Sequence, residues 1–283
     1  MHVKTVKSFM ALAILFGCAS ALNAASAVVN LTLSNQATLA ANDDGSTDAV
    51  TLNIGGASGV NFFGQSFTQV YVNNNGNVTF GNSLAQYTPN GLAAGVGFPI
   101  IAPYFADVDT RGTGSGLVNY GNATYNGHDA FVVNWPAVGY YSSQIDKLNT
   151  FQLILTDRSD VGAGDFDVEF NYNTMQWETG EASGGVDGLG GTSAVAGYSN
   201  GLSGAANVYY QLPGSLVNGA LIDGGPDALI ANSLNSNVLG RYDFQVRNGQ
   251  VVGVAPEPMS FGLIGAGIFA LALFRKKFRR QSA

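Results

Sequence analysis

The sequence contains a single cysteine, Cys18, which lies close to its N-terminus. The rest of the chain therefore has neither a disulfide framework nor a thiolate metal site, and its stability must come from its core. Histidine is almost as scarce, because only His2 and His128 occur. The sequence also lacks a Gly-x-Ser-x-Gly elbow and a His-x-x-x-His spacing. It thus offers no motif for a Ser-His-Asp or metal-histidine enzyme, and we expect His128 to be a turn residue.

Basic residues are scarce in the body of the chain. All nineteen Asp and Glu lie between Asp43 and Glu257, and that stretch holds only five basic residues, which gives it a net charge of −14. These five are Arg111, Lys147, Arg158, Arg241 and Arg247. Such a body repels the phosphates of nucleic acids and anionic lipid surfaces, whereas it suits divalent cations. We therefore exclude nucleic acid as a partner.

Residues 1–27 have the pattern of a secretory signal peptide. Lys4 and Lys7 precede an apolar run that ends in small residues. Cleavage fits after any of three alanines, Ala21, Ala24 and Ala27. A lipoprotein box ending at Cys18 is the weaker interpretation, because Phe16 is bulky where that pattern has a small residue. We therefore expect an exported protein.

Residues 28–252 form the body, and their composition favours turns over helices. Asn-Gly occurs six times and Asp-Gly three times in the chain, and these pairs suit turns with positive φ. Alternating apolar residues flank Asn75-Gly76 and Asn126-Gly127, which predicts two hairpins. Further strands are expected in FQLILTD, DFDVEF and RYDFQVRNGQVVGV, and a short helix only near residues 227–231. This pattern predicts an all-β fold, an antiparallel β-sandwich-like domain.

Residues 98–177 carry the most distinctive motifs of the body. They include the segments Ala102–Asp109, Trp135, Asn149–Gln152, Asn171-Tyr172 and Gln176-Trp177. Their order and spacing resembles the nidogen-like (NIDO) domain, with Tyr104-Phe105 in place of the Phe-Trp pair of that family. The resemblance implies an extracellular module with a role in adhesion or matrix assembly. It brings no catalytic residues with it.

Asp107 and Asp109 lie two residues apart ahead of a glycine-rich turn, an arrangement that suggests oxygen ligands for calcium. An EF-hand loop does not fit, because Arg111 and Val118 occupy positions where that loop needs oxygen ligands. A calcium site of another type, built from Asp107 and Asp109, is the functional interpretation. The structural one, which we favour, places both carboxylates at a strand end with Arg111 paired to one of them.

Asp165, Asp167 and Glu169 alternate with apolar residues, so a strand places their carboxylates on one face. A solvated sheet face is the favoured interpretation, and a metal site or an acid–base pair is the alternative. Trp135 and Trp177 could stack on sugar rings, but strand tryptophans in a body without disulfides are more often part of the core.

The C-terminal 31 residues contain three elements in order. Residues 253–258 are a linker that ends in Pro256, Glu257 and Pro258. Residues 259–274 form an apolar run of about 24 Å as a helix, a minimal transmembrane span. Residues 275–283 form a basic tail that fixes the C-terminus on the cytoplasmic side through Arg275, Lys276, Lys277, Arg279 and Arg280.

This order resembles the PEP-CTERM sorting signal of Gram-negative bacteria. The resemblance implies transient anchoring in the inner membrane, cleavage near the Pro-Glu-Pro by an exosortase-type membrane protease, and transfer to the cell surface or the extracellular matrix. The two prolines keep the segment extended, as a protease substrate requires. A permanent anchor is the alternative.

These features together predict a non-enzymatic, structural or adhesive protein of the cell surface, an exopolysaccharide matrix or a biofilm. Its expected partners are extracellular polysaccharide or surface proteins. Two alternatives remain at this point. A secreted hydrolase of matrix polysaccharide would need two carboxyl groups that face each other in a cleft. A calcium-dependent structural module would gain thermal stability from calcium.

Overall fold

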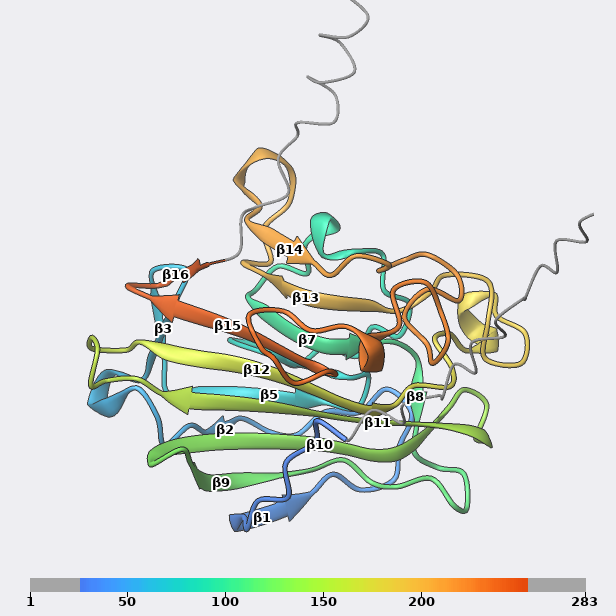
Figure 1. Cartoon of the computed structure of the whole chain (residues 1–283), viewed down its shortest axis with the longest axis horizontal. Helices are drawn as coiled ribbons and strands as arrows, with labels where there is room; N and C mark the ends of the chain where they lie inside the picture. Colours follow the sequence, from blue (N-terminus) through green and yellow to red (C-terminus); the bar gives the residue numbers. More distant parts are fainter. Residues whose placement is uncertain (1–25, 254–283) are drawn as a thin grey trace, which may run out of the picture.

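A computed structural model describes residues 26–253, which form two antiparallel sheets that lie face to face (Figure 1). The front sheet contains, in order, β1 (Ser34–Thr38), β9 (Asn119–Tyr125), β10 (His128–Tyr140), β11 (Gln144–Asp157), β12 (Phe166–Thr174), β15 (Arg241–Arg247) and β16 (Gln250–Val252). A further short strand, β8 (Val108–Asp109), pairs with β10. The back sheet contains, in order, β14 (Tyr209–Gln211), β13 (Val195–Ser199), β7 (Ile100–Phe105), β6 (Asn77–Thr79), β5 (Gln69–Asn73) and β2 (Val50–Thr51). A separate hairpin joins β3 (Val60–Phe62) to β4 (Gln65–Phe67). The predicted all-β, antiparallel, sandwich-like class is thus confirmed.

The helices of the described part of the chain are short 3₁₀ turns. They are η1 (Gly56–Ser58), η2 (Leu92–Ala94), η3 (Glu181–Ser183), η4 (Gly204–Ala206) and η5 (Leu229–Ala231). The prediction of a short helix near residues 227–231 is therefore wrong for an α-helix. The segment forms only the 3₁₀ turn η5. One turn is too short to offset the cost of nucleating an α-helix, and here Leu229 instead anchors the turn in the core.

Both predicted hairpins form around their Asn-Gly pairs. Asn126 and Gly127 both have positive φ, of 51° and 84°, and join β9 to β10. The turn at Asn75-Gly76 joins β5 to β6, and there Gly76 has a positive φ of 73°. Asn248 and Gly249 form a further hairpin between β15 and β16, with φ of 48° and 76°. These conformations match the twist of the flanking strands, so the local turn chemistry fixes the strand register.

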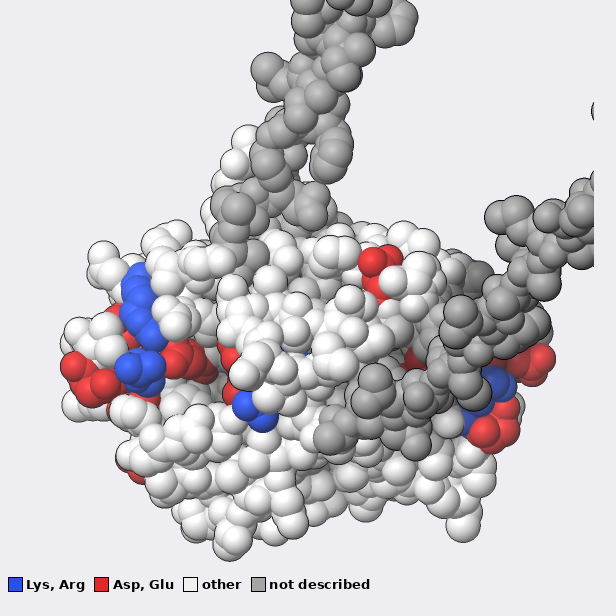
Figure 2. Space-filling view, viewed as in Figure 1, with Lys and Arg blue, Asp and Glu red and all other residues white. Residues whose placement is uncertain are grey.

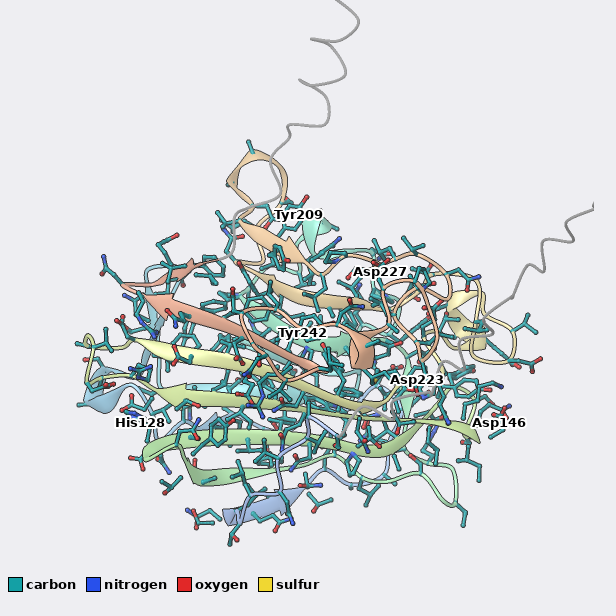
Figure 3. All side chains as sticks on the ribbon, in the orientation of Figure 1. His128, Asp146, Tyr209, Asp223, Asp227 and Tyr242 are labelled. Atoms are coloured by element: carbon teal, nitrogen blue, oxygen red, sulfur yellow. The ribbon has the colours of Figure 1, made fainter. Side chains whose placement is uncertain are left out.

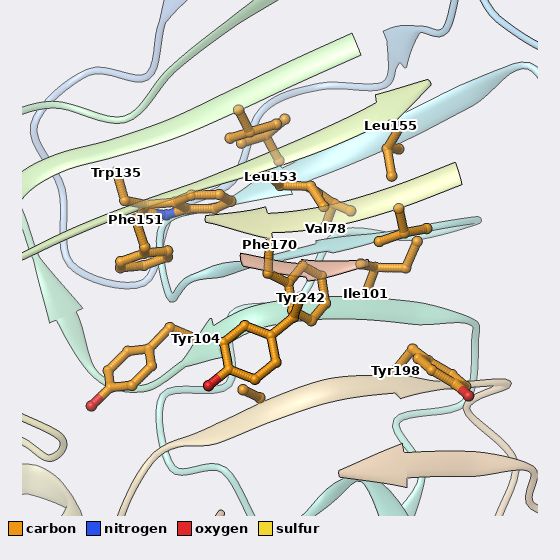
Figure 4. Packing of buried hydrophobic residues seen from close by; sticks show 14 of the residues in the cluster. Val78, Ile101, Tyr104, Trp135, Phe151, Leu153, Leu155, Phe170, Tyr198 and Tyr242 are labelled. Atoms are coloured by element: carbon orange, nitrogen blue, oxygen red, sulfur yellow. The ribbon is translucent and has the colours of Figure 1, made fainter. Parts of the chain in front are cut away.

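The space between the sheets is filled by aromatic and aliphatic side chains (Figure 4). Trp135 stacks on Phe151 with ring centroids 5.0 Å apart, and Trp177 packs edge-on against Tyr104. Both tryptophans are fully buried. Their indole N–H groups donate to backbone carbonyls, Trp135 to Asn74 and Trp177 to Val138. The prediction that these tryptophans belong to the core is confirmed.

An N-terminal extended segment, residues 26–33, packs on the outer face of the front sheet. Its apolar residues Val29, Leu31 and Leu33 cover Ala130, Val132 and Ile154. Ala27 is buried and its N–H donates to the carbonyl of Tyr172. Signal-peptide cleavage after Ala21 or Ala24 would keep this residue in the fold, whereas cleavage after Ala27 would remove it.

The predicted signal peptide up to residue 25, and the predicted linker, membrane helix and basic tail from residue 254 onward, lie outside the described residues. Between residues 26 and 253, no helix has the length and apolar character needed to cross a membrane.

Candidate functional site

Asp109, one of the two predicted calcium ligands, is held by protein donors. Its Oδ1 accepts hydrogen bonds from the backbone N–H and the Nε of Arg111, both at 2.9 Å. Its Oδ2 accepts from Arg111 Nη2 at 2.6 Å and from the Ser143 N–H at 2.7 Å. Although burial favours the neutral carboxyl, these bonds hold the pKa of Asp109 below its usual range. The structure thus shows the pairing with Arg111 that the structural interpretation expects.

Asp107, the other predicted ligand, has a different environment. The residue is 1% exposed, and its Oδ2 is buried with no hydrogen-bond partner among the described residues. One carboxylate oxygen from each of Asp43, Asp44 and Asp107 lies within 4.8 Å of the others. We call these three residues the aspartate cluster. The structure therefore brings Asp107 together with Asp43 and Asp44, whereas Asp109 forms a salt bridge with Arg111.

The aspartate cluster holds more negative charge than its positive neighbour can balance. Burial, followed by the charges of Asp43, Asp44 and Asp109, raises the pKa of Asp107 to about 7. Burial and the charges of Asp109 and Asp44 likewise raise the pKa of Asp43 to about 6. Arg111, whose Nη2 lies 2.8 Å from Asp43 Oδ2, lowers both pKa values but does not cancel these effects.

Buried asparagines in the turn between β5 and β6 position the aspartate cluster. Asn74 Nδ2 donates to the carbonyls of Asp43 and Val108, each at 2.6 Å. Asn75 Nδ2 donates to Asp44 Oδ1 at 2.8 Å, while its Oδ1 accepts from the Val108 N–H at 2.9 Å. This turn therefore ties the segment around Asp43 to the start of β8.

Sequence reasoning missed Asp43 and Asp44. The only local signal is Asn42-Asp43-Asp44-Gly45, which reads as an ordinary surface turn. Asp107 is more than sixty positions away, and only the pairing of the sheets brings the two segments together.

A second candidate site is a cavity of about 470 Å³ on the outer face of the front sheet, which we call the outer pocket. Its lining includes Tyr125, Arg158, Asp167, Glu169 and Asp243. Glu169 on β12 is directly opposite Asp243 on β15 in the strand register. Two carboxyl groups thus converge in this pocket.

The expected solvated face of Asp165, Asp167 and Glu169 is wrong. Asp165 and Glu169 are 5% and 8% exposed, and Asp167 is half-buried. Asp165 accepts from the Asn248 N–H at 2.7 Å, and Asp167 accepts from Arg158 at 2.8 Å and Arg247 at 2.6 Å.

Glu169 also has several protein partners. It accepts hydrogen bonds from Tyr125 Oη at 3.0 Å and Asn171 Nδ2 at 2.6 Å, and its Oε1 lies 3.3 Å from Arg241 Nε. Together with the partners of Asp165 and Asp167, these contacts direct the three carboxylates to different donors. They do not gather into one metal site.

The carboxyl groups of Glu169 and Asp243 share one electrostatic environment. Burial, then the charge of Glu169, raises the pKa of Asp243 to about 7, while the charge of Arg241 lowers it. The pair meets the first requirement of the hydrolase alternative, which is the convergence of two carboxyl groups in a cleft.

Charged side chains gather at the two ends of the long axis, with few on the face between them (Figure 2). His128 lies at one end, at the start of β10, and Asp146 at the other (Figure 3). His128 Nδ1 is 3.9 Å from Asp160 Oδ1, a surface contact beside the turn. His128 therefore lies directly after the turn at Asn126-Gly127, as the first residue of a strand and not in the turn itself.

The antiparallel sandwich, with asparagine and tryptophan motifs buried in its core, defines the class of protein as an all-β module. A comparison with family models makes the assignment specific. The nidogen-like domain matches residues 68–248, and the chain belongs to this family.

Curated relatives agree with this assignment. Human alpha-tectorin is 34% identical over 232 residues, which cover 74% of this chain and 10% of alpha-tectorin. Nidogen from Drosophila melanogaster is 28% identical over 151 residues, which cover 44% of this chain and 11% of nidogen. The chain thus matches only about a tenth of the length of these relatives. No solved structure matches it significantly.

Proposed function

We propose that the protein is an exported structural or adhesive component of the bacterial cell surface or of an exopolysaccharide matrix. Its membership of the nidogen-like family carries this proposal. Alpha-tectorin and nidogen, which share this domain, are extracellular matrix proteins. Because only the domain is shared, the proposed role is that of the module, and its partners are extracellular polysaccharide or surface proteins.

We further propose that the C-terminal segment is a sorting signal that an exosortase-type protease removes. The ordered Pro-Glu-Pro, apolar run and basic tail support this function. The fold supports it as well, since β16 ends at Val252, ahead of Pro256. Cleavage at residues 256–258 would therefore leave every described strand in the released part.

The test is the C-terminal peptide of the protein recovered from the surface and medium fractions of its host. We expect mass spectrometry to find a terminus between Pro256 and Pro258. Replacement of residues 256–258 by alanine should leave the full chain in the inner membrane, because the protease loses its recognition sequence. A matched control changes an exposed proline and an exposed glutamate, Pro213→Ala with Glu181→Ala, and should be processed normally.

Two results would contradict the sorting function. One is an intact tail through Ala283, found only in the inner membrane, which would make the segment a permanent anchor. The other is normal release of the alanine variant. In the first case the protein would face the periplasm, and its matrix role would be lost.

A further inference from the structure

Two acceptor atoms of the aspartate cluster have no donor. Asp107 Oδ2 and Asp43 Oδ1 are both buried and have no hydrogen-bond partner among residues 26–253. Asp107 is more than nine-tenths buried, and its carboxylate faces those of Asp43 and Asp44. A buried acceptor without a donor destabilises the folded state, and more so when it is charged. A cation bound between these carboxylates would supply the partner that the two oxygens lack.

Protein donors already occupy the neighbouring carboxylate. Arg111 uses its N–H, Nε and Nη2 on Asp109, and only Nη2 also reaches Asp43. No hydrogen bond from a basic side chain within the described part of the chain reaches Asp107 or Asp44. No basic side chain between residues 26 and 253 thus neutralises these two carboxylates.

The surrounding backbone is fixed in place. The N–H of Thr110 donates to the Asn42 carbonyl at 2.9 Å, and the N–H of Asn74 donates to the Gly45 carbonyl at 2.9 Å. With the side-chain bonds of Asn74 and Asn75, these contacts hold the carboxylates close together despite their repulsion. A preformed set of oxygen ligands of this kind lowers the ordering cost of binding a cation.

We propose that Asp43, Asp44 and Asp107 bind a calcium ion. Calcium takes six to eight oxygen ligands in irregular geometry, whereas magnesium demands a near-ideal octahedron and retains its waters. Three carboxylates on two separate segments suit calcium better than magnesium. The ligand set differs from the pair expected from the sequence, because Asp109 is the partner of Arg111 and Asp43 and Asp44 take its place.

A bound ion would join the segment before β2 to the segment that leads into β8. Hydrogen bonds hold the segment of residues 42–47 to Thr110, to β5 and to the turn that follows β5. Calcium would thus act as a clamp that stabilises the N-terminal part of the sandwich. This role does not depend on how the C-terminal segment is sorted.

The test is thermal unfolding of the full chain, purified in detergent, with and without about 10 mM CaCl₂. We expect calcium to raise Tm by about 3–8 °C, the shift for a ten- to hundredfold excess over a Kd of about 0.1–1 mM. Magnesium at the same concentration should give less than half of this shift. No calcium shift, or an equal shift with magnesium, would overturn the proposal.

Two variants locate the site. Asp107→Asn keeps the shape of the side chain and removes its charge, so it should abolish the calcium shift. As a control, Asp48→Asn removes an exposed carboxylate next to the segment of residues 42–47 and should retain the calcium shift. A calcium shift retained in Asp107→Asn would contradict the ligand set.

Direct binding provides an independent measurement. Trp135 donates to the Asn74 carbonyl beside the aspartate cluster, so it should sensitise the luminescence of bound Tb³⁺. Calcium should displace this signal in the wild type. If Asp107→Asn fails to fold, Asp44→Asn serves in its place, because Asp44 is partly exposed. Sensitised emission that persists at full strength in the folded variant would also overturn the proposal.

Discussion

Replacing Asn149 by alanine should lower the free energy of unfolding by about 3–4 kcal/mol. The side chain is fully buried, and its Nδ2 donates to the Trp177 carbonyl at 2.8 Å. Its Oδ1 accepts from the N–H groups of Gln176 and Trp177, at 2.6 Å and 3.2 Å. Alanine would leave buried backbone groups without these partners and create a small cavity. Chemical denaturation of the full chain in detergent measures the loss.

An exposed asparagine provides the matched control for this change. Asn53→Ala removes the same side chain from the surface and should alter stability by less than about 0.5 kcal/mol. If Asn149→Ala were as mild as Asn53→Ala, the asparagine would not be what holds the segment after β12 in place. The motifs of the family would then need another physical explanation.

The motifs that identify the family in the sequence meet in the structure. Asn149 bonds to Gln176 and Trp177, and the Nδ2 of Asn171 donates to Gln152 at 3.1 Å. The Tyr172 hydroxyl donates to the Pro103 carbonyl at 2.6 Å. Separate stretches of residues 98–177 are thus one hydrogen-bonded unit. The sequence shows their spacing, but only the fold shows that they are partners.

Local patterns predicted the local structure. The hairpins at Asn75-Gly76 and Asn126-Gly127 followed from turn chemistry and alternation, which depend on residues next to each other. The order of the back sheet did not follow, because β13 reaches β7 from about ninety positions away. Pairings of that range depend on packing that no short pattern encodes.

The same limit explains the errors at the sites. The stretch Asp107–Asp109 suggested one pair of ligands, but the two carboxylates have different neighbours, and those of Asp107 lie in a distant loop. The strand with Asp165 and Glu169 suggested a solvated face, because alternation shows which residues share a face but not what covers it. Tyr125 and Arg241, which contact Glu169, come from other strands.

Replacing Asp243 by asparagine should stabilise the protein at pH 8 and have a much smaller effect at pH 5. The folded pKa of about 7 lies above the usual value of 3.8, because the carboxyl is buried beside Glu169. Its contribution is therefore fully present below about pH 4 and is lost as the pH rises through 7. The ionisable groups around it are Asp167 and Glu169 on β12, Arg241 on β15, Tyr125 on β9, and His128 and Arg158 at the rim of the outer pocket.

The expected gain at pH 8 is about 1–2 kcal/mol. In a fully buried group, a pKa shift of this size would correspond to a larger change in the free energy of unfolding. The gain is smaller here because Asp243 is partly exposed and solvent screens its charge. Asparagine is uncharged, as the protonated carboxyl is, so the two proteins should differ much less at pH 5, where most of the loss has not yet occurred. Urea denaturation of the wild type and the variant at both pH values measures the difference in their free energies of unfolding. The contributions of the other titrating carboxyls are the same in both proteins and cancel in this difference. Asp129→Asn, on an exposed position of β10, should show no such pH dependence. A variant less stable than the wild type at pH 8 would mean that Arg241 compensates the Asp243 carboxylate and that its folded pKa is not raised.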